Sequence, residues 1–437
     1  MQSSGIENRR LGVAVVGLGG AVASTAVAGV ELMRRGIAGT DGLPLAGLET
    51  LVPYENLVFG GWDLCEDDLA SAAASQGVLP ADQLKSAKPA LADIRPWPAV
   101  MDPEFCRNAV GTHCVAAEGH SGRVEKIRSD LRGFKEDHDL DGAVLVNLAS
   151  VERTADPASP ALANSAAFER ALEEDDPEIG PAMIYAYAAI MEGVPYVNFT
   201  PSVAADAPAL IELAEREGVP VAGKDGKTGQ TMIKTVLAPA LRSRALRVDG
   251  WFSTNILGNG DGHTLSDPDS LASKIDTKGS VLDDMLGYEV PDHIVNINYY
   301  RPRGDSKEAW DNVDLIGFLG QKMQLKINFL CGDSVLAAPL VIELARLADL
   351  AKLRGESGPQ EQLGLFFKAP MVREPGSRPE HAFHTQEAAL LSWIEHGREA
   401  EEGTNGTNGK EAANGSGVIS NGKVAAGTKD GPPGESR

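Results

Sequence analysis

Length, composition and charge exclude several classes of protein before any motif is considered. The chain has 437 residues, 43% hydrophobic and 23% charged, which is typical of a globular protein with room for two domains. Its net charge of −22 argues against a nucleic-acid or anionic membrane surface, because both require clustered Lys and Arg. Four irregularly spaced cysteines without a CxxC pair predict neither a disulfide framework nor a zinc knuckle. Without a secretory leader or a bilayer-length apolar run, we expect a cytoplasmic protein.

A strand, a glycine turn and a helix open the chain. Leu11–Gly17 is an apolar run that predicts a buried parallel strand, and helical periodicity begins near Ser24. Glycines in the turn let the backbone approach a pyrophosphate, and the helix N-terminus points its amides at that charge. These glycines are Gly17, Gly19 and Gly20. Val22 stands where GxGxxG has its third glycine, and Ala23 follows it, so either a dinucleotide site or a tight turn before a packed helix fits the pattern.

Asp63 is the candidate for the acid that binds a ribose. In dinucleotide folds this acid lies about 20 residues after the turn, at the end of the second strand. Here an inserted loop from Gly36 to Pro53 accounts for a longer separation. The alternative role for Asp63 is an N-cap of the following helix.

Strands and helices then alternate with short links. Strands are predicted at Gly142–Ser150, Pro195–Ser202 and 219–223, and a helix at Ala207–Glu217. This alternation predicts an α/β protein with a doubly wound Rossmann-type sheet, whose ligands lie at the carboxyl ends of the strands.

The loop GKDGKTGQT at 223–231 resembles a phosphate loop but lacks the Walker spacing, which disfavours a nucleotide hydrolase. Without a ligand, Asp225 and Lys227 would belong to an ordinary polar turn.

From about Met232 the pattern changes to a second, α+β layer. Strands are predicted at 248–262, His293–Lys307 and Gln321–Ser334, and we expect them to pair antiparallel. The last one alternates apolar residues with polar ones, including Lys322 and Lys326, which predicts one buried and one solvated face.

Two segments near the end complete the pattern. Asp333 precedes a long apolar helix, for which it is a candidate N-cap. A short strand, LGLFFKAP, carries Lys368 in an apolar setting that favours a functional role. The composition after about residue 399 lacks core-forming residues and predicts a disordered tail at 399–437.

Lys274 and Lys278 lie four residues apart in a Ser-rich segment. On a helix this spacing puts both ammonium groups on one face. They form either a solvated surface or a pocket for a phosphate.

These segments together resemble the inositol-1-phosphate synthase family from Leu11 to about Pro370. The motifs that carry the resemblance are GLGGAVAST, FGGWD, NLASVER, VNFTPS, GKDGKTGQT, TNILGNGDG, GDSK, GDS and FFKAP. Ala21 and Val22 depart from the family, which usually has Asn in the turn. The cofactor-binding residues implied by the resemblance are Gly17, Gly19, Gly20, Ala23, Ser24, Asp63, Ala149, Ser150, Asn198, Thr228, Gly229, Asp261 and Asp305. The implied catalytic residues are Lys274, Lys278, Lys307, Lys368, Asp225 and Asp333. The implied substrate-binding residues are Asn255, Gly258, Asn259, Lys274 and Lys278.

The resemblance implies an isomerase that converts D-glucose 6-phosphate into 1L-myo-inositol 1-phosphate with catalytic NAD. Its steps are oxidation at carbon 5, enolisation, an intramolecular aldol reaction and reduction. The enolate and the alkoxide need fixed cations, which lysines supply, and aspartates such as Asp225, Asp305 and Asp333 can hold the lysines in place. The family tends to be homotetrameric. The resemblance also implies an NAD-binding domain at 10–231 together with 337–398 and a catalytic and oligomerisation domain at 232–336. The sequence leaves open whether a divalent metal or a monovalent cation assists.

Three alternatives remain open. A related cyclase would act on another sugar phosphate. A simple NAD-dependent sugar-phosphate dehydrogenase would not need the four lysines together and would accumulate NADH. A non-enzymatic NAD sensor or scaffold would keep the glycine turn and tolerate loss of the lysines.

Overall fold

The computed structural model describes residues 5–107, 109–156, 158–258, 281–374 and 376–397. Residues Met1–Leu391 form one compact unit, and Ser392–Arg437 form a second. The predicted tail at 399–437 lies outside the described residues. The sheets, the pocket and the contacts considered below belong to the first unit.

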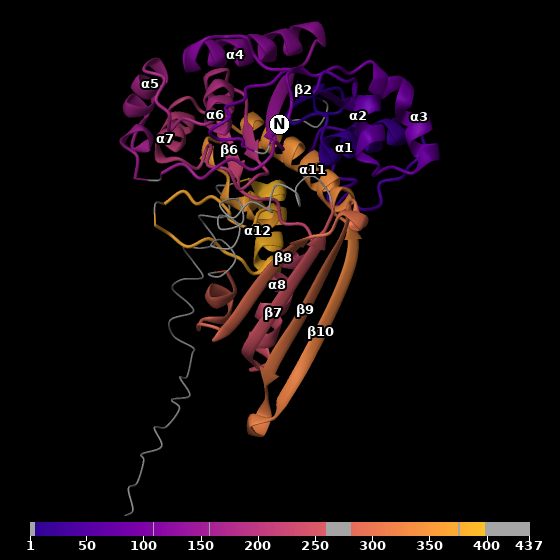
Figure 1. Cartoon of the computed structure of the whole chain (residues 1–437), viewed down its shortest axis with the longest axis vertical. Helices are drawn as coiled ribbons and strands as arrows, with labels where there is room; N and C mark the ends of the chain where they lie inside the picture. Colours follow the sequence, from indigo (N-terminus) through magenta and orange to yellow (C-terminus); the bar gives the residue numbers. More distant parts are fainter. Residues whose placement is uncertain (1–4, 108, 157, 259–280, 375, 398–437) are drawn as a thin grey trace, which may run out of the picture. The chain divides into compact units, whose positions relative to one another are not determined.

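A parallel seven-stranded sheet forms the first layer of this unit (Figure 1). Its strands are β1 (Leu11–Val16), β2 (Leu57–Asp63), β3 (Trp97–Pro98), β4 (Gly142–Asn147), β5 (Tyr196–Asn198), β6 (Pro220–Gly223) and β11 (Gly358–Pro359). They are ordered β11-β6-β5-β4-β1-β2-β3, and all neighbours are parallel. The run from β3 to β6 has the strand order of a doubly wound dinucleotide fold. The prediction of a Rossmann-type sheet is therefore confirmed, and its switch point lies between β1 and β4.

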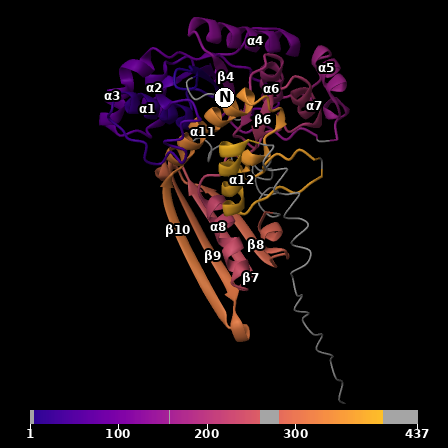
Figure 2. The ribbon, with the colours of Figure 1, turned by 180° about the vertical axis from the view of Figure 1, so that it is seen from behind.

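Helices pack against this sheet, with α1 to α3 gathered on one side and α5 to α7 on the other (Figures 1 and 2). In the described residues the α-helices are α1 (Ala21–Arg34), α2 (Leu69–Gln76), α3 (Ala81–Ala92), α4 (Gly119–Asp137), α5 (Ser165–Glu173), α6 (Pro181–Met191), α7 (Pro208–Arg216), α8 (Gln230–Ser243), α11 (Asp333–Leu353) and α12 (Phe383–His396). Among the described helices, none has both the length and the hydropathy needed to cross a bilayer.

Helix α1 begins three residues earlier than predicted, at Ala21 rather than Ser24. Gly20 takes an extended conformation as its N-cap, and its carbonyl accepts the Ser24 N–H at 3.0 Å, which closes the first turn. The amides of residues 21–23 therefore form the helix N-terminus, immediately after the glycine turn.

The second layer is a four-stranded sheet ordered β10-β9-β7-β8. Its strands are β7 (Arg247–Leu257), β8 (Asp292–Tyr299), β9 (Ser306–Ile316) and β10 (Lys322–Gly332). β9 is antiparallel to β7 and β10, whereas β8 is parallel to β7, so the expectation of an antiparallel sheet was wrong at one pair. The strand predicted at 293–307 ends at Tyr299, because the turn η4 (Arg301–Arg303) and Gly304, with φ of 53°, reverse the chain into β9. Strand β9 was not predicted from the sequence.

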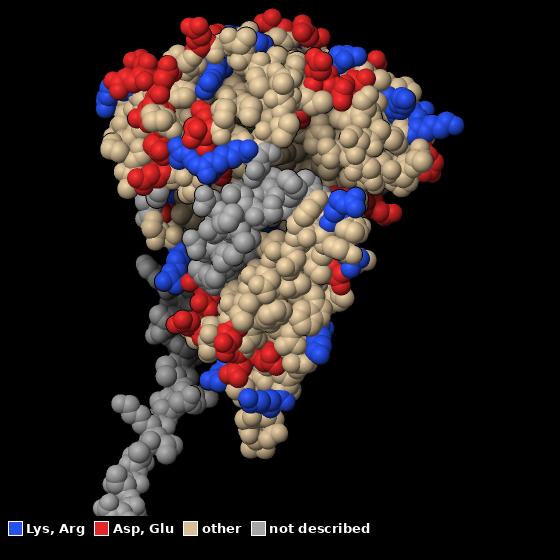
Figure 3. Space-filling model, viewed as in Figure 1, with Lys and Arg blue, Asp and Glu red and all other residues tan. Residues whose placement is uncertain are grey.

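Polar and apolar residues alternate along β10 as predicted, and on the polar face Lys322 and Lys326 are exposed. Its apolar residues are only half-buried or exposed, and Met323 is 44% exposed. The core of this layer lies between α8, residues 281–290 and the inner residues Trp251 and Val313. Figure 3 shows mixed charges over the first layer and a largely uncharged area over the second sheet, without a continuous positive area on the described surface of this face.

Candidate active site

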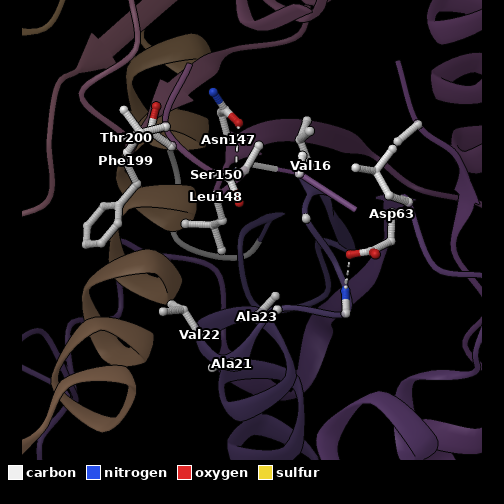
Figure 4. Close-up of a pocket in the computed structure, with 18 of the residues that line it drawn as sticks. Val16, Ala21, Val22, Ala23, Asp63, Asn147, Leu148, Ser150, Phe199 and Thr200 are labelled. Carbon is white, nitrogen blue, oxygen red and sulfur yellow. Dashed lines mark hydrogen bonds between the residues drawn. The ribbon is translucent and has the colours of Figure 1, made fainter. Parts of the chain in front are cut away.

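A cavity of about 670 Å³ opens at the carboxyl ends of the parallel strands. The glycine turn, the exits of β4 and β5, and a group of lysines and aspartates all contribute to its wall. Asp63 and the pair Phe199 and Thr200 lie on opposite sides of it, with the start of α1 between them (Figure 4). This is the crevice in which doubly wound sheets bind their ligands.

The glycine turn forms a close-fitting cradle. Gly17 has φ of +86°, and a Cβ there would lie 3.1 Å from the Leu148 carbonyl oxygen. A Cβ at Gly19 would lie 3.2 Å from the Asp63 carboxylate, and one at Gly20 would lie 3.1 Å from the Gly17 carbonyl. Next to this cradle, the first-turn amides of α1 lack intrahelical acceptors, which makes the helix start suited to an anion.

Asp63 is the last residue of β2 and lines the cavity. Its carboxylate accepts the Gly19 N–H at 2.8 Å and the Cys65 N–H at 3.0 Å. It is not a helix N-cap, because α2 is capped by Asp68, which accepts the Ser71 N–H at 2.8 Å. A carboxylate at the end of the second strand is placed to meet a ribose.

The exits of β4 and β5 contribute in different ways. Ala149 and Ser150 line the cavity, as their predicted cofactor role requires. Asn198 is buried, donates to the Ser202 carbonyl at 2.7 Å and accepts from the Thr200 hydroxyl at 2.9 Å. It therefore shapes the loop that brings Thr200 to the wall. Ser24 is also buried and donates to the Ala21 carbonyl within α1 at 3.3 Å.

Lys368 and Asp225 form the first charged pair of the cavity wall, with Nζ 2.8 Å from Oδ1. The segment predicted as a strand at 363–370 is instead the 3-10 helix η6 (Glu361–Phe366), followed by a chain that runs beside residues 224–227. The Lys368 N–H donates to the Asp225 carbonyl at 2.7 Å, and the Lys224 N–H donates to the Ala369 carbonyl at 2.8 Å. Asp225 has φ of 60°, a costly conformation that is typical of functional sites.

Lys307 and Asp333 form the second pair. The Lys307 ammonium lies 3.3 Å from each oxygen of the Asp333 carboxylate, and Thr228 donates to the same carboxylate at 3.3 Å. Asp333 is the first residue of α11 and not its N-cap, which is Gly332. Asp305, a predicted cofactor residue, also holds the helix start, because it accepts the Ser334 N–H at 3.2 Å and the Ser334 hydroxyl at 2.6 Å.

Two ammonium groups and two carboxylates thus line the same cavity as the glycine turn. Each carboxylate offsets the charge of its lysine and fixes the position of the ammonium group. Preorganised ammonium groups can stabilise an oxyanion that develops on a substrate, and a lysine can also transfer a proton.

The predicted site residues Asn259, Asp261, Lys274 and Lys278 lie outside the described residues. Gly258 donates its N–H to the Gly304 carbonyl at 3.1 Å, and a Cβ there would lie 2.5 Å from the Tyr300 carbonyl, so close packing explains this glycine. Gly229 is the N-cap of α8, and Asn255 is a buried residue of β7. In the described part of the chain, no group of three His, Cys, Asp or Glu side chains could hold a metal ion.

Glu152 was not predicted as a site residue, yet it is buried in the cavity wall. Its carboxylate accepts the Ala182 N–H at 2.8 Å, at the start of α6. Burial raises the pKa of Glu152 to about 8. Glu152 belongs to the NLASVER motif, but only the fold shows that its side chain turns inward.

Lys227, which would belong to an ordinary polar turn if the loop had no ligand, is buried, with 3% of its surface exposed. Its ammonium donates to Gln386 Oε1 at 2.6 Å, and its N–H donates to the Phe366 carbonyl at 2.8 Å. Burial lowers the pKa of Lys227 to about 7. The side chain therefore joins the loop of Asp225 to the C-terminal part of the unit.

Lys227 should make stability depend on pH. Between its folded pKa of about 7 and the ordinary value of 10.5, the unfolded chain holds a proton that the folded chain lacks. The free energy of unfolding should therefore rise with pH in this window, by up to about 1.4 kcal/mol per pH unit. Lys227→Met should reduce this rise, as measured by denaturant unfolding at pH 7.5 and 9.5. The exposed Lys322→Met is the control, and an unchanged pH slope in Lys227→Met would contradict the assignment.

The fold and the cavity together define a Rossmann-type enzyme whose dinucleotide crevice also carries paired lysines and aspartates. The sequence model of the family described as myo-inositol-1-phosphate synthase matches residues 41–395. The chain is 42% identical over 400 residues to inositol-3-phosphate synthase 1 of Bacteroides thetaiotaomicron, covering 86% of this chain and 93% of that protein. It is 33% identical over 431 residues to inositol-3-phosphate synthase of Spirodela polyrhiza, covering 87% and 84% of the two chains. The chain therefore belongs to the myo-inositol-1-phosphate synthase family.

A solved structure agrees with this assignment. The crystal structure of inositol-3-phosphate synthase from Caenorhabditis elegans matches with a TM-score of 0.83 and 29% identity, covering 89% of this chain and 86% of that one. The resemblance inferred from the sequence motifs is thus confirmed at the level of family and fold, and the family is one of isomerases.

Proposed function

We propose that this protein uses NAD catalytically to isomerise D-glucose 6-phosphate to 1L-myo-inositol 1-phosphate. The observation that carries the proposal is the convergence of both Lys–Asp pairs and the glycine turn on one cavity. Family membership supports it, because the curated relatives carry the name of this synthase.

The residues around the crevice fit NAD. Any side chain at Gly17, Gly19 or Gly20 would enter tight contact with backbone or carboxylate atoms, so the turn is built for close approach of a ligand. The amides of residues 21–23 would hold the pyrophosphate, and Asp63 would hold the adenosine ribose. When bound, NAD would supply the reversible removal and return of a hydride at one sugar carbon.

The lysine pairs have the chemistry that the remaining steps require. Enolisation beside a ketone needs a group that accepts a carbon-bound proton and a cation near the developing oxyanion. Lys368 Nζ, held by Asp225, and Lys307 Nζ, held by Asp333, can serve in these roles. The family resemblance adds Lys274 and Lys278 to this set, with Asn255, Gly258 and Asn259 as substrate contacts and Thr228, Gly229, Asp261 and Asp305 as further cofactor contacts.

The wider organisation belongs to the same proposal. We propose a cytoplasmic homotetramer, with residues 10–231 and 337–398 as the NAD-binding domain and 232–336 as the catalytic and oligomerisation domain. The β11 strand supports this division, because it returns to the parallel sheet after the second sheet is complete.

Whether a divalent metal or a monovalent cation is needed is tested by assaying activity after chelation and in different monovalent salts.

Incubation of the purified protein with glucose 6-phosphate and a small amount of NAD tests the proposal. Phosphorus NMR should show an inositol phosphate formed over many turnovers per NAD, without accumulation of NADH. NADH that accumulates in proportion to the glucose 6-phosphate consumed would instead identify a simple dehydrogenase. Turnover of another sugar phosphate, with none of glucose 6-phosphate, would identify a related cyclase.

A further inference from the structure

A chain of buried polar side chains runs through the second layer. Asp311 on β9 is fully buried and accepts three hydrogen bonds from described residues, of which two come from donors on β7. Trp251 Nε1 lies 2.8 Å and the Ser253 hydroxyl 2.6 Å from its Oδ1, while Gln230 Nε2 lies 3.1 Å from its Oδ2. Gln230 in turn accepts the Asn255 side-chain N–H at Oε1, at 2.6 Å. We refer to Asp311, Gln230 and Asn255 as the relay.

The direction of each hydrogen bond in the relay follows from the chemistry of Asp311. A carboxylate only accepts hydrogen bonds, so Gln230 must turn its NH₂ group toward it. The Gln230 carbonyl then faces Asn255, which must turn its own NH₂ group toward that carbonyl. The Asn255 carbonyl oxygen is left over, and among the described residues it has no hydrogen-bond partner although it is buried.

A buried acceptor without a partner is costly, so it indicates a donor that arrives with a ligand. Gln230 follows directly after Thr228 and Gly229, so the relay adjoins the loop that contributes Asp225 and Thr228 to the cavity. A hydroxyl group of a sugar phosphate is a donor of this kind.

We propose that Asp311 is a positioning residue, which acts through Gln230 to make Asn255 present a carbonyl oxygen to a substrate hydroxyl. The substrate part of this inference rests on the proposed function. Asp311 sets the polarity of the contact although a second side chain separates it from Asn255.

Asp311→Asn tests the relay because it keeps the shape and reverses the polarity. The new amide at position 311 can still accept from Trp251 and Ser253, but it donates to Gln230, which must then turn over. Asn255 would turn as well and offer an NH₂ group to the substrate hydroxyl. We expect kcat/KM for glucose 6-phosphate to fall about tenfold to a hundredfold, with NAD affinity unchanged, because the substrate hydroxyl can no longer donate to Asn255 and must turn from its bound orientation to accept instead.

Asn255→Asp completes the test through rescue. Alone, it places a second acceptor against the Gln230 carbonyl, so both kcat/KM and melting temperature should fall. Combined with Asp311→Asn, it meets the turned NH₂ group of Gln230 and again offers an acceptor to the substrate. The double variant should therefore be more active and more stable than Asn255→Asp alone. The matched control is Asp314→Asn, because Asp314 on the same strand also accepts from a glutamine amide, that of Gln324 at 3.0 Å, but is exposed.

Each outcome decides a separate point. The relay would be overturned if the changes in melting temperature caused by Asp311→Asn and Asn255→Asp simply add in the double variant, as they should when Asp314→Asn takes the place of Asp311→Asn. This readout does not depend on the reaction. Rescue of stability with an unchanged kcat/KM in Asp311→Asn would overturn the contact with the substrate. An inactive parent protein would overturn the proposed function, while the stability order would still decide the relay. If Asp311→Asn does not fold, Gln230→Ala replaces it in the double variant. Gln230→Ala removes the carbonyl that opposes the new carboxylate, so Asn255→Asp should then cause no loss of stability through that contact.

Discussion

Lys368→Ala is expected to lower turnover by about 10²–10³-fold, which is the usual cost of removing a preorganised charge from a developing oxyanion. The Lys368 ammonium is held 2.8 Å from the Asp225 carboxylate and lines the cavity, so its loss removes a cation directed at the substrate. NAD affinity should be retained, because the glycine turn and Asp63 lie on other segments. Turnover by phosphate-product assay and NAD binding by calorimetry measure the two effects.

The matched control is Lys224→Ala. Lys224 forms an ion pair with Asp206 at 2.7 Å and lies one residue before Asp225, yet its pair is not part of the cavity wall. Lys224→Ala should leave turnover within a fewfold of that of the parent protein, because a partly exposed ion pair contributes little. Equal losses in Lys224→Ala and Lys368→Ala would mean that the loop needs its ion pairs only for structure.

Lys307→Ala should behave like Lys368→Ala, and the double variant should lose less than the product of the two single losses. Groups that act on the same transition state are not independent, so their effects do not add. The family resemblance predicts the same behaviour for Lys274→Ala and Lys278→Ala. Near-normal turnover in these two variants would show that they are solvated surface lysines.

Gly19→Val is expected to abolish NAD binding. A Cβ at Gly19 would lie 3.2 Å from the Asp63 carboxylate and 3.4 Å from Ala72, so the branched side chain must displace the turn or Asp63. It would also occupy the approach of the pyrophosphate. Both effects act on the cofactor, and calorimetry should detect no binding at concentrations that saturate the parent protein.

Gly29→Val provides the control for this substitution. Gly29 lies in the same helix, α1, and no atom lies within 4 Å of a Cβ placed there. The NAD affinity and melting temperature of the Gly29→Val variant should match those of the parent protein. An unchanged NAD affinity in Gly19→Val would show that the cofactor does not bind at this turn.

Local patterns in the sequence were sufficient for the parallel sheet and the dinucleotide crevice. The apolar run before Gly17 and the alternation of strands with helices report the periodicity of buried elements, which neighbouring residues determine. The glycines of the turn and Asp63 could be predicted for the same reason, since backbone geometry at a strand end depends on adjacent residues. Motifs such as GDSK and FFKAP indicated Lys307 and Lys368 as site residues through their resemblance to the family.

The partners of these charged groups were decided only by the tertiary structure. Asp225 and Lys368 are separated by 143 positions, and Lys307 and Asp333 by 26, and no local pattern determines which carboxylate meets which ammonium. The burial of Lys227, the inward turn of Glu152 and the direction of β8 also depend on elements distant in sequence. Hydrogen-bond polarity behaves in the same way, because the orientation of the Asn255 amide depends on Asp311 through a third side chain. Periodicity and turn chemistry are local, whereas burial, charge pairing and hydrogen-bond direction arise when distant segments pack together.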